Sequence, residues 1–252
     1  MLIDTHAHVN DERLMPFAAD IHDGLKDAGI EKVVVAGYDR ASSERAVLLS
    51  REYPAYYASV GIHPHDSDSA SADDYALFGK LSSESKCVAI GEIGLDYYYD
   101  LSEREIQKKV FAEQIELAYS LKKPIIIHVR DAYGDALKIL RDSSKLLAYG
   151  GVMHCFGGSA EVMREAVGLG LYIAFGGAVT FKNFAKSDVV RAVPAERLLL
   201  ETDCPYMTPV PFRGKDNRPE YIGLVRDKIQ EWRQDIDVEE VTCKNAKTLF
   251  NI

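Results

Sequence analysis

Hydrophobic and polar positions follow two alternating patterns along the chain. Eight short runs are rich in β-branched and other apolar residues, and turn-forming or charged residues separate them. Runs of this length and composition predict β-strands. They occupy residues 2–8, 32–38, 56–65, 87–95, 124–130, 150–156, 171–181 and 198–206.

Longer segments with helical spacing lie between most of these runs. The clearest is Ser102–Leu121, in which Ser102 and Glu105 predict a capping box at the start of the helix. Pro124 then prevents the helix from continuing into the next strand. Further helices are predicted at Asp11–Ala28, Ser42–Tyr53, Tyr133–Leu147, Ala160–Leu169, Pro219–Trp232 and Val238–Leu249.

Strands that alternate with helices predict an α/β protein with a parallel sheet. Eight such repeats in 252 residues match a (β/α)8 TIM barrel, which needs about 250 residues. An open doubly wound sheet is the alternative. No linker, low-complexity tract or long charge block divides the chain, so we expect a single domain over residues 1–252.

Charge and composition narrow the possible functions. The formal net charge of −9 disfavours a broad, non-specific nucleic-acid binder, so a nucleic-acid enzyme would need locally concentrated cations. No apolar run is long enough for a bilayer, and the N-terminus has no secretory pattern. Four scattered cysteines without a C-x-x-C pair fit a reducing cytosol. We therefore expect a monomeric cytoplasmic protein that does not associate with membranes.

Ionisable residues gather at the ends of the predicted strands. Only His22 of the seven histidines falls in a predicted helix. In a parallel barrel the carboxyl ends of all strands meet at one face, where the active site is built. The residues expected at that face are His6, His8, His63, His65, His128 and His154, together with Glu92, Glu201 and Asp203.

Alternation along a strand predicts which of these side chains converge. Residues two apart point the same way, so His6 and His8 share one face of the first strand. The two carboxylates of the last strand share a face for the same reason. Cys155 and Cys204 each neighbour a candidate ligand and should point away from it, into the packing between strand and helix.

These donors indicate a metal centre. A lone H-x-H pair is more often hydrogen-bonded core or surface than a ligand pair, but several buried imidazoles and carboxylates together are costly without a cation. One catalytic metal needs about three protein ligands and an open position, so six donors indicate two divalent ions. Imidazole with carboxylate favours zinc, manganese, cobalt or iron, and magnesium is possible. The six are His6, His8, Glu92, His128, His154 and Asp203.

At these residues the chain resembles the TatD family of metal-dependent deoxyribonucleases, within the amidohydrolase-like barrels. Each motif is modest alone, but eight of them in the family's order cover nearly the whole chain. They are "IDTHAHVN", "GIHPH", "GEIGLDYY", "PIIIHVRDA", "HCFGG", "TFKN", "ETDCPY" and "RGKDNRPEYI".

The resemblance implies how the donors divide between two metals. The first metal would be held by His6, His8, Glu92 and Asp203, and the second by Glu92, His128 and His154. Glu92 would bridge the two ions. His63, with His65 in the same motif, would contact the substrate.

Further roles follow from position and chemistry. Asp203 would orient or deprotonate the attacking water, and Glu201 would orient a ligand histidine from behind. Phosphate often binds at the loops after strands 7 and 8 of a barrel. Of the cations near that face, we expect Arg130 and Arg213 to hold phosphate oxygens, although loop cations are as often simply solvated.

Tyrosines also collect at the strand ends. Tyr97, Tyr98, Tyr99 and Tyr206 could stack on the bases of a single strand, or could serve only in packing. We take Tyr206 as a candidate substrate contact.

The leading hypothesis is a deoxyribonuclease with 3′–5′ exonuclease activity, acting on single-stranded 3′ ends of DNA with water activated by two divalent ions. The same centre could activate water against a carbonyl. An amide or ester hydrolase, such as a D-aminoacyl-tRNA deacylase, is therefore the alternative. A non-catalytic metal-binding scaffold is disfavoured because nothing in the sequence indicates closed coordination.

Overall fold

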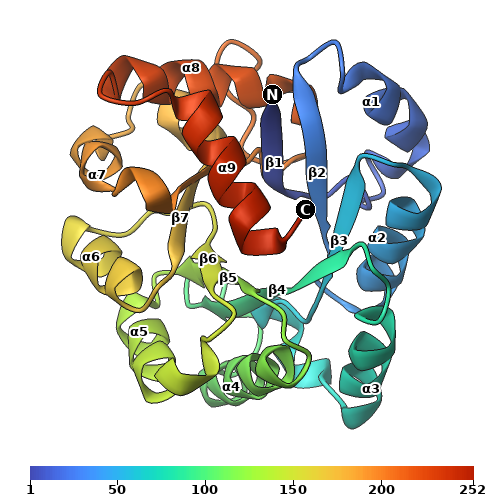
Figure 1. Cartoon of the computed structure of the whole chain (residues 1–252). Helices are drawn as coiled ribbons and strands as arrows, with labels where there is room; N and C mark the ends of the chain where they lie inside the picture. The colour runs from blue at the N-terminus through green and yellow to red at the C-terminus, as the bar shows by residue number, and fades with distance from the viewer.

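The computed structural model describes the chain from Met1 to Ile252 and contains one parallel sheet of eight strands in the order β1 to β8 (Figure 1). All eight predicted strands are confirmed, and this sequential order excludes the open doubly wound sheet. The strands are β1 (Leu2–Ala7), β2 (Ile30–Ala36), β3 (Tyr56–Val60), β4 (Cys87–Asp96), β5 (Ile125–Arg130), β6 (Gly151–Met153), β7 (Tyr172–Phe175) and β8 (Leu198–Leu200).

Helices surround the sheet on the outside (Figure 1). They are α1 (Ala18–Gly24), α2 (Arg40–Glu52), α3 (Ala72–Leu81), α4 (Arg104–Ser120), α5 (Tyr133–Asp142), α6 (Ala160–Gly168), α7 (Ser187–Ala192), α8 (Ile222–Trp232) and α9 (Val238–Phe250). Short 3-10 helices occupy Met15–Phe17, Pro64–Ser69, Ser144–Leu146, Gly177–Thr180, Ala195–Arg197 and Pro219–Tyr221. None of the helices combines the length and apolar composition that a membrane span requires.

The sheet closes between its first and last strands. The backbone N–H of Asp203 donates to the carbonyl of His6 at 2.9 Å, and the N–H of His8 donates to the carbonyl of Cys204 at 2.7 Å. The hydroxyl of Thr5 adds a hydrogen bond to the carbonyl of Leu200 at 2.9 Å. The arrangement is the predicted (β/α)8 barrel, and its seam joins the segments that carry His6, His8 and Asp203.

Two apolar clusters separate the interior of the barrel from its outer layer. The larger cluster packs the strands against the surrounding helices. The smaller one fills the barrel with alternate strand residues and is sealed by Leu249 and Phe250 of α9, which crosses the N-terminal end of the barrel (Figure 1). Apolar side chains thus fill this end of the barrel, and the histidine cluster lies at the opposite end.

A register irregularity in β1 affects the predicted alternation. Ile3 belongs to the interior cluster, and His6, three residues further on, also turns inward, although a regular strand would place these two residues on opposite faces. The pairing of β1 with β2 shifts between Asp4 and Ala7, which accounts for the change of face. His6 and His8 still converge as predicted, with their Nε2 atoms 3.1 Å apart.

The helix predictions were less complete than those of the strands. Helices α3 and α7 were not predicted, since α3 lies in an Asp- and Ser-rich segment and α7 has only six residues. The predicted capping box of Ser102 was wrong. Helix α4 begins at Arg104 without a side-chain cap, and the Ser102 hydroxyl instead donates to the carbonyl of His65 at 2.8 Å. Ser102 therefore ties the β4 loop to the His65 segment.

Candidate metal centre

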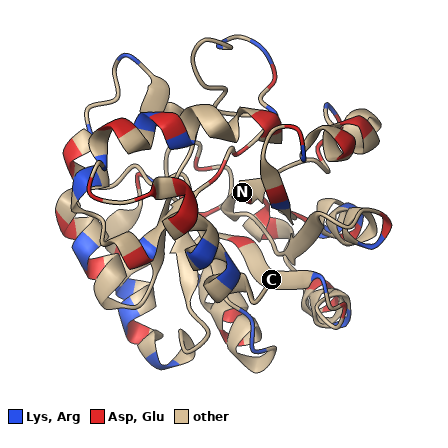
Figure 2. Cartoon of the chain, turned by 45° about the horizontal axis from the view of Figure 1, so that its top comes forward, with Lys and Arg blue, Asp and Glu red and all other residues tan.

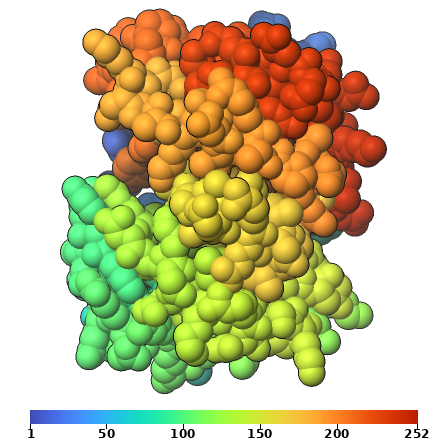
Figure 3. Space-filling model, turned by 90° about the vertical axis from the view of Figure 1, so that its left-hand side faces the viewer, coloured from blue at the N-terminus to red at the C-terminus, as the bar shows by residue number.

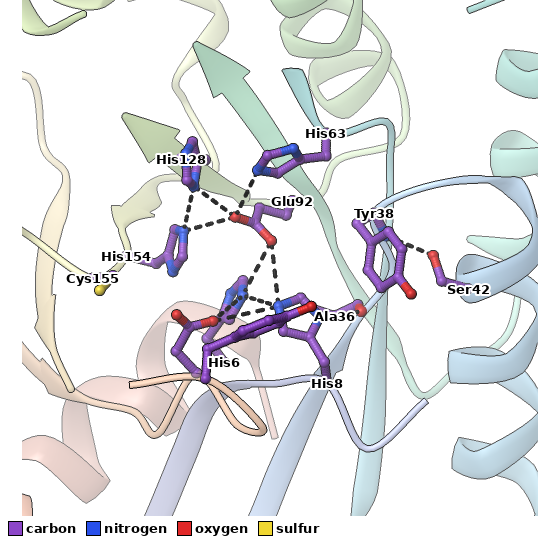
Figure 4. A network of polar contacts seen from close by, with 12 residues as sticks. His6, His8, Ala36, Tyr38, Ser42, His63, Glu92, His128, His154 and Cys155 are labelled. Atoms are coloured by element: carbon purple, nitrogen blue, oxygen red, sulfur yellow. Dashed lines mark hydrogen bonds and ion pairs between the residues drawn. The ribbon is translucent and has the colours of Figure 1, made fainter. Parts of the chain in front are cut away.

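Glu92, on β4, lies at the centre of the histidine cluster and is only 4% exposed. Its Oε1 is 2.9 Å from His128 Nδ1 and 2.8 Å from His154 Nε2 (Figure 4). Its Oε2 is 3.3 Å from His6 Nε2 and 3.5 Å from His8 Nε2. Oε1 thus faces His128 and His154, with His63 Nε2 at 3.4 Å, and Oε2 faces the other two imidazoles.

Glycines around Glu92 allow β4 to approach its neighbour β5. A Cβ on Gly94 would lie 1.9 Å from the carbonyl oxygen of His128, and one on Gly91 would lie 2.6 Å from Cβ of Ile126. Gly94 also has a positive φ of 145°. Only glycine fits such a backbone position, so the "GEIG" run brings Glu92 and His128 together.

Asp203, just beyond β8, completes the Oε2 side of the cluster. Its Oδ1 lies 3.4 Å from His8 Nε2 and 3.7 Å from His6 Nε2. The seam between β8 and β1 delivers it there, because the backbone N–H of Asp203 is bonded to the carbonyl of His6. All six predicted ligand residues therefore lie in one cluster.

The spacing of these atoms fits metal coordination. Ligand atoms around a tetrahedral zinc ion, with bonds of about 2.0–2.1 Å, lie about 3.3 Å from one another. On the Oε2 side, five of the six distances among the four donor atoms run from 3.1 to 3.7 Å. On the Oε1 side, three donor atoms lie 2.8 to 3.1 Å apart. The donor set thus fits a four-ligand position beside a three-ligand position.

The outer nitrogens of three of these histidines face oxygen atoms. His8 Nδ1 is 3.1 Å from the carbonyl of Ala36, which can only accept, so Nδ1 carries the proton and Nε2 offers its lone pair inward. His128 Nε2 is 3.0 Å from Asp96, and His154 Nδ1 is 3.6 Å from Glu201. Metal-binding histidines typically donate their second N–H to such groups. The tautomers that these contacts favour leave the inward nitrogens free to coordinate.

His63 has a different arrangement. Its Nδ1 accepts a hydrogen bond from the backbone N–H of His65 at 3.2 Å, so in the neutral ring the proton sits on Nε2. That nitrogen lies 3.4 Å from Glu92 Oε1. Burial lowers the pKa of His63 to about 4, which keeps the ring neutral. His63 is therefore a donor toward the centre and lacks a free inward lone pair.

Asp96, at the end of β4, is a member of the site that the sequence analysis missed. Its Oδ2 lies 3.0 Å from both His128 Nε2 and His65 Nε2. It is 1% exposed, and burial by itself would raise its pKa, but the hydrogen bonds from His128 and His65 hold that pKa well below its ordinary value. Asp96 lies four residues after Glu92 on the same strand, so the alternation of side chains was a signal that could have identified it.

Glu201 lies behind His154, where it was expected. It is fully buried, and its Oε1 accepts a hydrogen bond from the backbone N–H of Cys155 as well as facing His154 Nδ1. The prediction for the two cysteines was right for Cys204, which is buried in the outer core. It was wrong for Cys155, which is only partly buried and lies outside both apolar clusters. Strand β6 ends at Met153 and Cys155 has a positive φ of 43°, so strand alternation no longer applies there.

Electrostatics at the cluster favour added positive charge. Burial by itself would raise the pKa of Glu92, but the surrounding imidazoles, led by His154, hold it well below its ordinary value. Burial would likewise lower the pKa of His154, yet the negative charge of Glu92 raises it well above its ordinary value. The carboxylates thus stay ionised and attract cations, either as protons on the imidazoles or as a divalent metal ion.

The remaining predicted residues lie further out. Arg130 is exposed and packs over the ring of Tyr98, with its Cζ 3.8 Å from the ring centroid. The ring of Tyr206 lies 6.1 Å from that of His8. Arg213 packs over Phe181 at 4.0 Å and donates to the carbonyl of Thr208 at 3.0 Å. These contacts hold Arg213 at the rim, and none of them joins it to the histidine cluster.

A groove of about 970 Å³ lies between α8 and α9 at the other end of the barrel. Its charged groups are mostly paired with one another, as in Met1 N to Glu239 at 2.7 Å and Lys247 to Glu31 at 2.7 Å. No imidazole lines it. The centre around Glu92 is therefore the better candidate for chemistry.

A (β/α)8 barrel with buried imidazoles and carboxylates at its C-terminal face has the architecture of a metal-dependent hydrolase. The model of the family described as "TatD related DNase" matches residues 3–251. The metal-dependent hydrolase YabD of Bacillus subtilis is 46% identical over the full length of both chains. The 3'-5' ssDNA/RNA exonuclease TatD of Escherichia coli K12 is 33% identical over 90% of each. The crystal structure of YjjV, a TatD homologue of E. coli K12, superposes with a TM-score of 0.94 at 31% identity and covers 100% of this chain and 98% of its own.

The chain belongs to the TatD-related DNase family, as the resemblance of its motifs indicated. It is a metal-dependent hydrolase of the TatD type.

Proposed function

We propose that this protein is a monomeric cytoplasmic 3′–5′ exonuclease that removes nucleotides from single-stranded DNA with two divalent metal ions. The dimetal proposal is supported mainly by the position of the Glu92 carboxylate, whose two oxygens face two separate sets of ring nitrogens. The nucleic-acid substrate is supported by the TatD relatives, which are named as exonucleases of single-stranded DNA and RNA.

Each side of Glu92 would hold one ion. His6, His8 and Asp203 would complete the first position, and His128 and His154 would complete the second. When bound, two divalent ions neutralise charge on a phosphate and lower the pKa of water at the centre. A metal ion held by the three ligands on the Oε1 side would keep an open coordination position for water or substrate.

The protein's own groups would place the proton and the substrate. Burial alone would raise the pKa of Asp203, but the hydrogen bond from His8 keeps it below its ordinary value, so the carboxylate is ionised at neutral pH. An ionised Asp203 can orient the attacking water and accept its proton. His63, with its proton on Nε2, would donate to a phosphate oxygen next to Glu92.

The test compares substrates with the purified protein loaded separately with zinc, manganese or magnesium. Linear single-stranded DNA labelled at the 5′ end should be shortened progressively from its 3′ end. A closed single-stranded circle of the same composition should resist, since it offers no end. Equal rates on the circle and the linear strand would exclude an exonuclease.

The same assay includes RNA and an aminoacyl ester. Degradation of RNA beside DNA would broaden the substrate class without changing the mechanism. A clear preference for the aminoacyl ester would replace the proposal with carbonyl chemistry at the same centre. Asp203→Asn serves as the control for contaminating nucleases, because an adventitious activity would survive that substitution.

A further inference from the structure

Large aromatic side chains are exposed beside the centre on the loop after β4. Tyr98 is 58% exposed and Tyr99 is 54% exposed, and Arg130 of β5 lies over both rings, at 3.8 and 4.9 Å from their centroids. The ring of Tyr99 also makes an edge contact with His65, with centroids 5.3 Å apart. We call Tyr98, Tyr99 and Arg130 the β4 platform.

A similar combination is found on the loop after β8. Tyr206 is 49% exposed, and the guanidinium of Arg13, from the segment after β1, lies 4.6 Å from its ring centroid. The ring of Tyr206 is 6.1 Å from that of His8. We call Tyr206 and Arg13 the β8 platform.

The two platforms lie across the centre from each other. In a closed barrel with strands in sequential order, β4 is four positions from β8 and β5 is four positions from β1, which places each pair on opposite sides. The surface in Figure 3 is hollowed between the green part of the chain, around the β4 loop, and the orange part, around the β8 loop. Atoms of the blue N-terminal segment are visible within the hollow.

Hydrogen bonds attach the backbone of both platforms to the site. Asp96, the carboxylate that contacts His128, also accepts hydrogen bonds from the backbone N–H groups of Tyr98 at 3.0 Å and Tyr99 at 2.9 Å. On the other side, the N–H of Tyr206 donates to the carbonyl of Asp203, and its own carbonyl accepts from Asn217 at 2.7 Å. Each platform is therefore anchored to a residue of the metal cluster.

We infer that these platforms stack the two unpaired bases on either side of the scissile phosphodiester, one base on each platform. The inference rests on the proposed function and names how the nucleic acid is held. Exposed tyrosine rings offer a face to any base. Arg130 adds positive charge beside the β4 platform on a chain of net charge −9, whereas the charge of Arg13 is paired with Asp11 at 2.9 Å. A duplex end would have to be unpaired before its bases could lie on opposite sides of the centre.

Exposed tyrosines elsewhere lack these features and provide a matched control. Tyr119, at the end of α4, is 43% exposed and contacts Tyr149 with centroids 6.0 Å apart. Neither of these rings has an arginine over it or contacts a residue of the cluster. Tyr119→Ala should therefore leave cleavage and binding of DNA at the parental level.

The experiment combines variants that lack a platform side chain with oligonucleotides that lack a base. Tyr98→Ala, Tyr98→Phe, Tyr206→Ala and Tyr206→Phe are compared with the parent and Tyr119→Ala on single-stranded oligonucleotides. The oligonucleotides are intact, abasic at the 3′-terminal position, or abasic at the penultimate position. The readouts are kcat/KM for release of the first nucleotide, metal content, and equilibrium binding of the oligonucleotide measured by fluorescence anisotropy in EDTA.

We expect each alanine variant to lose about tenfold in kcat/KM on the intact strand, since one base–aromatic stack typically contributes that much. The loss should shrink to within about twofold on the abasic strand that lacks the base for that platform. The abasic position that abolishes the loss should differ between the Tyr98 and Tyr206 variants. The phenylalanine variants should retain parental rates, because stacking needs the ring and not the hydroxyl. Metal content should stay unchanged throughout.

Two results would overturn the inference. One is an alanine variant that cleaves and binds the intact strand like the parent, and the other is a loss that is equally large on every abasic strand. If the parent protein cleaves no nucleic acid but binds the oligonucleotide through these tyrosines, the proposed function is refuted and the stacking inference is supported. A parent that neither cleaves nor binds single strands would remove both.

Discussion

The two ends of the barrel use charged residues in opposite ways. At the C-terminal end, Glu92, Asp203 and four imidazoles lie together, buried or partly buried, and the carboxylates have no lysine or arginine partner. At the N-terminal end, the groove between α8 and α9 carries both signs of charge, paired at the surface, as in Lys247 with Glu31. Figure 2 shows that acidic and basic residues are interspersed along the outer helices.

The difference shows that burial decides whether a charged side chain needs a compensating charge nearby. Both charges of an exposed ion pair remain hydrated, so the pair contributes little to the stability of the fold. A buried carboxylate among imidazoles needs a compensating positive charge, which the protein does not supply from its own lysines or arginines. The C-terminal end therefore needs added positive charge, as protons on the imidazoles or as a metal ion, whereas the charges at the N-terminal end are already paired.

The largest effect is expected when the Glu92 carboxylate, which faces both halves of the centre, is removed. We expect Glu92→Ala to lose both metal ions, with affinity reduced by more than about a hundredfold, because even residues behind the ligands typically contribute ten- to a hundredfold. Elemental analysis after dialysis measures the loss, and thermal unfolding checks that the barrel persists. Two ions retained per chain would exclude Glu92 as the bridge.

A smaller effect is expected from Asp96, which holds a ligand histidine from behind. Asp96→Ala should reduce metal affinity by about ten- to a hundredfold, and mainly at the position that uses His128. Calorimetric titration with zinc, which resolves two binding steps, measures the change. Asp135→Ala is the control, because this exposed carboxylate bonds Tyr97 and Lys108 without touching a ligand. Equal losses at both steps would show that Asp96 acts on the whole fold instead.

Arg213 tests whether a rim cation takes part in catalysis. If it holds a phosphate oxygen, Arg213→Ala should lower kcat/KM on DNA by about tenfold to a hundredfold, the value of one charge-assisted contact. Arg213→Lys should recover only part of this loss, because lysine keeps the charge but lacks the planar fork. Metal content should be parental in both proteins. An unchanged rate in Arg213→Ala would confine Arg213 to its contacts with Phe181 and Thr208.

The smallest effect is expected at the N-terminal end. Lys247→Met should change the free energy of unfolding by no more than about 0.5 kcal/mol and leave metal content and activity unaltered. The hydrogen bond from Lys247 lowers the pKa of Glu31 in the folded protein. The pair's contribution is therefore present above the ordinary pKa of Glu31, about 4.3, and is lost as the pH falls through the lower folded value.

Denaturant titrations of Lys247→Met and the parent across this acid range measure the contribution. The difference in unfolding free energy should be largest near neutral pH and should diminish toward pH 3. A loss of metal or activity in this variant would contradict the separation of the two ends.

Much of this molecule could be predicted from local patterns. The eight apolar runs predicted the eight strands, and their alternation with helical segments predicted the barrel. The strand ends of a parallel barrel meet at one face whatever the loops do, so the positions of His6, His128 and Glu92 along the chain were sufficient to predict that they converge. The family followed from eight motifs in order.

Other features depend on which segments become neighbours. Ser102 looked like a helix cap, but a better partner, the carbonyl of His65, lies across the loop. The inward turn of both Ile3 and His6 requires a register shift that arises only where β1 pairs with β2. Helix α7 has only six residues, too few to be stable by itself, so it depends on packing against the barrel.

Tertiary structure also decides which histidines of the site can act as metal ligands and which act as hydrogen-bond donors. Sequence spacing could place a histidine at the centre, but it could not tell a ligand from a donor, because that depends on what the second ring nitrogen meets. His8 meets a carbonyl and is left with a free inward nitrogen, whereas His63 meets a backbone N–H and is left with an inward proton. Composition and periodicity are local properties of the chain, while a proton's position on a ring is set by atoms that only folding brings within hydrogen-bonding distance.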